Sequence, residues 1–126
     1  MNRLFNQFFN SLERGKVVLF ANVAIGSTGA PTINALKSKG VTSVVRNSAG
    51  NYTITLNDKY VDLFFLNVNF INSGGAGVAY FYTESQDVVG AKTIVVQFKD
   101  LSGAAVDPNS GTTMQVEMIL KSSTAP

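Results

Sequence analysis

The spacing of hydrophobic residues along the chain changes from a helical period to a strand period at Gly15. Before this glycine, large apolar side chains recur at helical intervals with polar residues between them. The pattern predicts an amphipathic helix over residues 2–14, about 20 Å long, that ends at Gly15. Its apolar stripe consists of Leu4, Phe5, Phe8, Phe9 and Leu12. A single helix of this length is only marginally stable in water, so we expect it to pack against another surface.

After Gly15, apolar and polar residues alternate, which is typical of strands that bury one face. The last run is the clearest, because Met114, Val116, Met118 and Leu120 alternate with polar residues and are therefore expected to face inward. Seven runs of this kind are separated by turn-forming segments. They cover residues 17–23, 41–46, 52–56, 61–70, 78–83, 93–98 and 112–120. Short strands without long helices between them predict an all-β fold, an antiparallel β-sandwich of jelly-roll type.

Two segments between the first strands are not expected to form strands. Residues 26–34, GSTGAPTIN, are rich in turn formers, and residues 35–40, ALKSKG, predict a turn or a single helical turn. The hairpin that follows has a clear signature in RNSAGNYTITL, residues 46–56. Its loop over residues 47–51 supplies residues that tolerate a positive φ. The change of period at Gly15 divides the chain into a helical arm, residues 1–15, and a β-sandwich domain, residues 16–126.

The predicted strand over residues 61–70 has apolar residues on both of its faces. Strict alternation places Phe64, Leu66, Val68 and Phe70 on one face. The other face begins with Val61, Leu63 and Phe65 and becomes polar at Asn67 and Asn69. A second apolar face requires a cover, either the N-terminal helix or a neighbouring subunit. We therefore predict a subunit contact through Val61, Leu63 and Phe65 and self-association, as a trimer.

Composition adds to this picture of a protein built for assembly. The 126 residues suggest one domain, and only 14% of them are charged, which protects a free monomer poorly against association. The net charge of +2 without a basic cluster argues against a nucleic-acid partner. The apolar run at residues 17–26 is too short to span a bilayer, and the N-terminus lacks a signal-peptide pattern. We expect a soluble protein that has no membrane partner and is made without export.

The residues needed for most catalytic chemistry are scarce. The sequence has no cysteine and no histidine, which excludes disulfides, thiol nucleophiles, Cys/His zinc sites and an imidazole base. Carboxylates lie at strand ends or in loops, where solvated acids are common; the pairs weighed for glycoside hydrolysis are Asp58/Asp62, Glu84/Asp87 and Asp100/Asp107. Calcium binding through Asp100, Asp107 and Asn109 lacks the EF-hand spacing. We predict that the protein is not an enzyme and has no catalytic residue, metal site or cofactor.

Two segments together resemble a module of tailed-bacteriophage structural proteins. They are VVRNSAGNYTITLNDKYVDLFF, residues 44–65, and VVQFKDLSGAAVDPNSGTTMQVEMIL, residues 95–120. The resemblance rests on a turn of the S-x-G-x-Y-T-x-T type and on a later D-x-S-G-x-x-x-D-P loop that leads into the last strand. Modules of this kind end tail fibres, and related small β-proteins decorate capsids. The chain has no repetitive fibre shaft, so it looks more like a capsid decoration, or cement, protein.

The resemblance implies a virion protein on the capsid surface, made in the cytoplasm of the bacterial host. Its partners would be the major capsid protein and other copies of the same chain, with the helical arm as the anchor on the shell. The alternative is a receptor- or glycan-binding module at the tip of a tail fibre or head fibre. The contact regions would then be the loops at residues 74–77 and 102–111.

Overall fold

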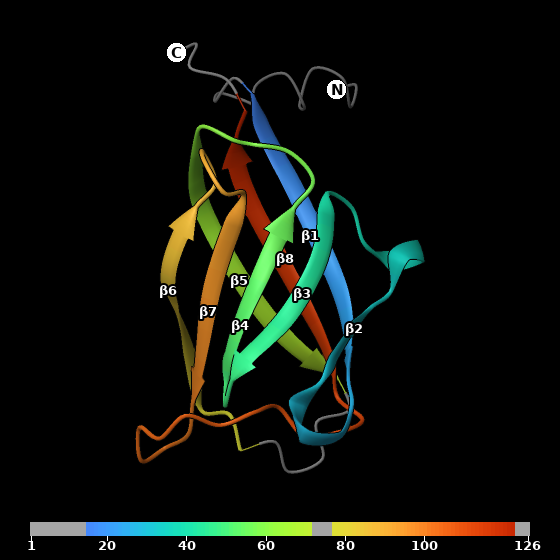
Figure 1. Ribbon diagram of the computed structural model, residues 1–126, viewed down its shortest axis with the longest axis vertical. Coiled ribbons are helices and arrows are strands. Elements are labelled where there is room, and N and C mark those ends of the chain that lie inside the picture. The colour runs from blue at the N-terminus through green and yellow to red at the C-terminus, as the bar shows by residue number, and fades with distance from the viewer. Residues whose placement is uncertain (1–14, 72–76, 123–126) are drawn as a thin grey trace, which may run out of the picture.

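The computed structural model describes residues 15–71 and 77–122, and the helix predicted over residues 2–14 lies outside this part of the chain. The described residues form a β-sandwich of two antiparallel four-stranded sheets (Figure 1). The first sheet, called sheet I, has the strand order β2-β1-β8-β5. Its strands, in that order, are β2 (Pro31–Ile33), β1 (Lys16–Ile25), β8 (Thr113–Lys121) and β5 (Asp62–Ile71).

The second sheet, sheet II, has the strand order β3-β4-β7-β6. Its strands, in that order, are β3 (Val41–Ser48), β4 (Asn51–Leu56), β7 (Thr93–Lys99) and β6 (Tyr80–Asp87). Two short 3-10 helices, η1 (Ser27–Gly29) and η2 (Ala35–Lys37), flank β2. The single helical turn expected from ALKSKG is thus confirmed as η2. The prediction for GSTGAPTIN is wrong in part, because Pro31–Ile33 pairs with the end of β1.

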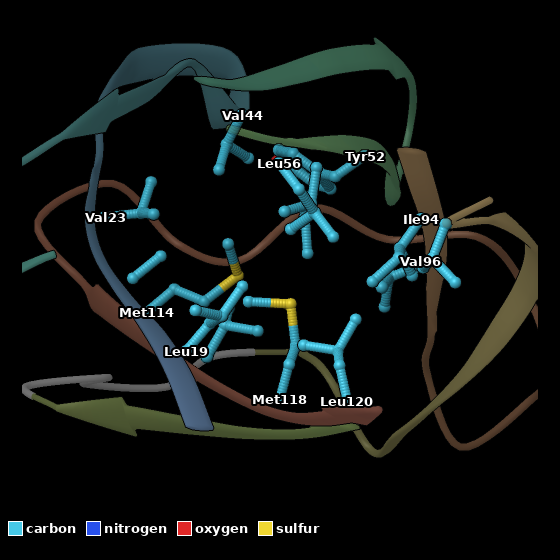
Figure 2. Packing of buried hydrophobic residues seen from close by; sticks show 14 of the residues in the cluster. Leu19, Val23, Val44, Tyr52, Leu56, Ile94, Val96, Met114, Met118 and Leu120 are labelled. Atoms are coloured by element: carbon cyan, nitrogen blue, oxygen red, sulfur yellow. The ribbon is translucent and has the colours of Figure 1, made fainter. Parts of the chain in front are cut away.

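The core lies between the two sheets and is built by every second residue of the strands, the residues that point inward. On β8 the prediction is confirmed, because Met114, Val116, Met118 and Leu120 are all buried. They meet side chains of the opposite sheet such as Tyr52, Leu56 and Ile94 (Figure 2). Sixteen apolar residues are buried in this cluster: Leu19, Ala21, Val23, Ile25, Val44, Tyr52, Ile54, Leu56, Val88, Ile94, Val96, Phe98, Met114, Val116, Met118 and Leu120. Burial of this apolar area is the main term that stabilises the sandwich.

The strand β5 departs from the strict alternation that the sequence suggested. Its pairing with β8 shifts by one residue between Leu63 and Phe65, so that Phe64 is an extra residue in the ladder. A bulge of this kind moves every later side chain to the other face of the strand. Leu63 therefore packs against the core, together with Leu66, whereas Phe65 is 49% exposed. The predicted common face of Val61, Leu63 and Phe65 is wrong for this reason.

The two ends of the sandwich carry different features. At one end, Gly15 enters β1 and its carbonyl accepts a 2.7 Å hydrogen bond from the backbone N–H of Ser122. The opposite end carries the β3–β4 turn and the long connection from β7 to β8, as Figure 1 shows. We call these the terminal end and the loop end. The two ends hold the two groups of residues that are candidates for function.

Candidate functional site

An ion pair at the loop end joins the two sequence segments 44–65 and 95–120. Arg46 Nε donates to Asp107 Oδ1 at 3.0 Å, and Nη2 donates to Oδ2 at 2.8 Å. The connection from β7 to β8 carries Asp107 across the end of the sandwich to β3, which holds Arg46. The planar guanidinium matches both carboxylate oxygens, which makes this a geometrically specific pair. The motif residues that the sequence singled out are thus joined in space.

Two further donors converge on the same carboxylate. The backbone N–H of Gly50 donates to Asp107 Oδ1 at 2.8 Å, and the Tyr52 hydroxyl lies 3.3 Å from the same oxygen. The hydroxyl also donates to the carbonyl of Gly29 at 2.7 Å. Burial raises the pKa of Asp107, but the hydrogen bonds from Arg46 and Gly50 outweigh it, so the pKa lies below its ordinary value. The carboxylate stays ionised and works as an acceptor that ties three segments together.

The turn between β3 and β4 requires glycine at position 50. Its φ is +69°, and a Cβ atom would lie 2.6 Å from the carbonyl oxygen of Phe98 and 2.7 Å from that of Val106. Both the backbone conformation and the space exclude a side chain. The S-x-G-x-Y pattern is therefore explained by the fold of the loop end, and no part of it is reactive.

The other acids named as catalytic candidates close their own loops. Asp87 accepts from the backbone N–H groups of Gly90 at 2.8 Å and Ala91 at 2.9 Å, and these bonds lower its pKa. Asp100 Oδ1 accepts from the hydroxyl of Ser102 at 2.7 Å and from the N–H of Ala104 at 3.0 Å, and its pKa is lowered as well. Each carboxylate is an acceptor that fixes a turn. Within residues 15–71 and 77–122, no three Asp or Glu side chains gather in a way that could hold a metal ion.

The outer face of sheet I has a different character, since its side chains form rows that cross three strands. The pairing of β1, β8 and β5 sets three neighbours side by side in each row. The apolar row consists of Val18, Ile119 and Phe65, and it lies next to the row of Lys16, Lys121 and Asp62 at the terminal end. The next row is mixed and consists of Phe20, Glu117 and Asn67. The third row, the amide row, consists of Asn22, Gln115 and Asn69.

The apolar row leaves large hydrophobic side chains in solvent. Val18 is 50% exposed and Phe65 is 49% exposed, and Phe20 beside them is exposed to a similar degree. Of the residues predicted for the subunit contact, Phe65 belongs to this row, Val61 is exposed just before β5, and Leu63 faces the core. The predicted anchoring residues Leu4, Phe5, Phe8, Phe9 and Leu12 lie outside the described residues. A contiguous exposed apolar patch of this kind is typical of a protein contact.

The mixed and amide rows border a depression of about 300 Å³. Its side chains come from β1, β8 and β5, and Lys37 of η2 completes one rim. Sequence reasoning missed this site because Asn22, Gln115 and the two asparagines of β5 are far apart in the chain. The one available signal was the repeated asparagine on β5, Asn67 and Asn69, in a strand where this residue type is disfavoured.

A second depression, of about 570 Å³, lies at the loop end. It is bordered by residues 77–79 and 100–102, and Leu101 at its rim is 96% exposed. Two loops were predicted to bind a receptor, residues 74–77 and 102–111. Gly77 and Ser102 from these loops border this depression, whereas residues 74–76 lie outside the described residues.

Comparisons with protein-family models, with curated proteins and with solved structures gave no match. Within the described residues, none of the helices has the length and apolar character that crossing a membrane requires.

Proposed function

We propose that this protein is a structural protein of a tailed-bacteriophage virion, a decoration or cement protein that binds the assembled head. The observation that supports it best is that both of its apolar attachment features belong to one end of the sandwich. The apolar row of Val18, Ile119 and Phe65 lies in the half of sheet I that is nearer Gly15, one row beyond Lys16, Lys121 and Asp62. Gly15 is the residue from which the amphipathic segment continues. The terminal end therefore attaches, and the loop end points away from the shell.

In this proposal the two features have separate roles. Residues 2–14 supply the arm that binds the major capsid protein, and the apolar row joins copies of the chain into a trimer. Each large apolar side chain buried in such a contact contributes about 1.5–3 kcal/mol before ordering costs. Because the arm would bind only assembled capsomers, binding would stabilise the head by mass action. No catalytic step is needed.

The order of the strands in the two sheets supports the same proposal. The orders β1-β8-β5 in one sheet and β4-β7-β6 in the other, with connections that pass between sheets, match a jelly roll that lacks one hairpin. Viral capsid proteins and lectins are frequent users of this architecture.

The experiment uses phage heads assembled without the protein. We expect wild-type protein to sediment with these heads and a variant lacking residues 2–14 to bind at least tenfold more weakly, about 1.4 kcal/mol or more. The control is Val45→Asp, which changes an exposed residue of sheet II away from the terminal end and is expected to bind normally. Normal binding by a folded truncated variant would remove the arm from the proposal, and no binding by the wild type would overturn the proposal itself.

A receptor-binding module at a fibre tip is the second candidate. It is favoured by the exposed Leu101 beside the loop-end depression. The two candidates differ in location, so the copy number of the protein on purified virions separates them: capsid stoichiometry supports decoration, and a few copies per particle support a fibre tip.

A further inference from the structure

We propose that the depression on the outer face of sheet I is a carbohydrate-binding site, in which the amide side chains of three strands bind the hydroxyl groups of a pyranose unit. The site is distinct from the apolar row and from the loop end. It does not depend on the attachment to a phage head, because its residues lie on the outer face of sheet I whatever the terminal end binds.

The chemistry of the lining residues carries the proposal. The side chains are mostly carboxamides, and each carboxamide offers two donors and two acceptor lone pairs. The polar lining residues are Asn22, Lys37, Asn67, Asn69, Gln115 and Glu117. A sugar hydroxyl is also both donor and acceptor, and neighbouring hydroxyls on a ring require several such groups at once. Carboxamides on adjacent strands provide them without a net charge.

These groups are available for a ligand. Asn69 Nδ2 donates to Gln115 Oε1 at 3.0 Å, which fixes two of the amides and leaves their remaining donors and acceptors open. The side chains of Asn22 and Asn67 have no hydrogen bond to any of the described residues. Because Asn69 and Gln115 are held by each other, part of the site is arranged before binding, which lowers the ordering cost.

The three asparagines of the site stand in strands, where this residue type is energetically disfavoured and is not needed for solubility. Asparagine is depleted in strands, yet Asn22 on β1 and Asn67 and Asn69 on β5 stand on the same outer face, on the two strands that flank β8. A fold that violates a local preference repeatedly at one place does so most often at a functional site.

Phe20 completes the site at the boundary with the apolar row. Its ring is 43% exposed and lines the depression beside Glu117. The face of an aromatic ring is negative, so it attracts the slightly positive C–H groups on the apolar face of a sugar ring. A volume of about 300 Å³ is at the small end for ligand sites, so one or two sugar rings would fit.

The test is a titration of ¹⁵N-labelled protein with a panel of pyranoses: glucose, galactose, mannose, N-acetylglucosamine and their disaccharides. We expect at least one sugar to shift the side-chain NH₂ signals of Asn22, Asn67, Asn69 and Gln115 with saturation, and a Kd on the order of 1 mM because the site is shallow. The Asn67→Ala and Gln115→Ala variants should each weaken binding at least fivefold. The control Asn47→Ala removes an exposed asparagine of β3 on sheet II and should leave the Kd unchanged.

Three results would overturn the proposal. One is a panel that gives no shift in these signals at about ten times the expected Kd. Another is binding that Asn67→Ala and Gln115→Ala leave intact, because the sugar would then lie elsewhere, for example at the loop end. The third is an equal response to an uncharged glycine-rich peptide, which would identify the face as a protein contact.

Discussion

Arg46 and Asp107 are 61 residues apart in the chain, yet they form a double hydrogen bond, with distances of 3.0 Å and 2.8 Å. The pair connects β3 to the connection before β8. Because Gly50 and Tyr52 donate to the same carboxylate, Asp107 serves three segments at once. This explains why a sequence pattern without reactive residues is nevertheless well defined.

Removal of this carboxylate should destabilise the fold. We expect Asp107→Ala to lower the free energy of unfolding by about 2–3 kcal/mol, because Arg46 and Gly50 lose an acceptor and the ion pair is only partly exposed. Urea denaturation would measure the change. The control is Asp58→Ala, which removes an exposed acid and should change stability by less than about 0.5 kcal/mol. Equal effects of the two substitutions would mean that the cluster does not hold the loop end.

The same carboxylate predicts how stability depends on pH. The pKa of Asp107 is lower in the folded protein than in the unfolded chain, so its contribution is present above the ordinary carboxyl pKa of about 4 and is lost as the pH falls through the folded value. In Asp107→Asn this part of the acid dependence should be missing. The lowered pKa values of Asp87 and Asp100 act in the same direction. The slope of the free energy of unfolding against pH should therefore decrease in the variant without vanishing. An unchanged slope between pH 2 and pH 5 in the variant would contradict the prediction.

Tyr52 predicts the opposite dependence at alkaline pH. Burial, followed by the charge of Asp107, raises the pKa of its hydroxyl above the ordinary value. Its contribution is therefore complete below about pH 10 and is lost as the pH rises, because the unfolded tyrosine ionises first. Tyr52→Phe should cost about 1–2 kcal/mol at neutral pH, since Gly29 loses its donor, and should show a weaker alkaline decline. Thermal unfolding from pH 7 to pH 11 in both proteins measures this; parallel curves would count against it.

Much of the fold could be predicted from the sequence, because period-two alternation reports which side of a strand is buried. The predicted inward face of β8 is confirmed, and the alternating residues Tyr52, Ile54 and Leu56 of β4 are buried together. Tyr80 and Tyr82 are exposed while Phe81 packs against the core, as alternation predicts. The short strand β2 was missed because its three residues lie in a turn-rich segment and only pairing with β1 makes them a strand.

The remaining differences depend on long-range contacts. The bulge at Phe64 has no signature within β5 and is set by the register against β8. The amide row joins residues of three strands, so no local pattern reports it. In the same way, the ion pair of Arg46 with Asp107 depends on how the β7–β8 connection crosses the loop end.

Two glycines separate the cost of backbone strain from the cost of steric overlap. Gly50 and Gly111 both have a positive φ, +69° and +87°, but only Gly50 has atoms within 3 Å of a built Cβ. Gly111→Ala should therefore cost about 1 kcal/mol for the left-handed conformation alone. Gly50→Ala should cost clearly more, about 3 kcal/mol, because the carbonyls of Phe98 and Val106 belong to rigid backbone. Similar unfolding midpoints for the two variants would show that the turn relaxes to admit the methyl group.

The bulge in β5 makes a test of self-association possible with two substitutions on one strand. Phe65 is 49% exposed in the apolar row, whereas Leu63, two positions earlier, packs against the core. If the apolar row joins subunits, Phe65→Asp should convert the expected trimer into a monomer with an unchanged far-UV circular dichroism spectrum, because the charge is placed in solvent once the copies separate. Leu63→Asp should instead unfold the domain or lower its thermal midpoint strongly, since it buries an unpaired charge.

Light scattering of both variants and of the wild type at micromolar concentration measures the mass, and circular dichroism measures the fold. Val45→Asp serves as the control, because Val45 is 52% exposed on sheet II and should change neither mass nor fold. A wild type that is monomeric over the whole range would remove the trimer from the proposal and leave the apolar row to another partner. Unfolding of both β5 variants would show that Phe65 also stabilises the domain. Strict alternation would instead place Leu63 and Phe65 on one face and Phe64 on the opposite, core-facing side. A normal thermal midpoint for Phe64→Asp would therefore confirm the bulge directly in solution.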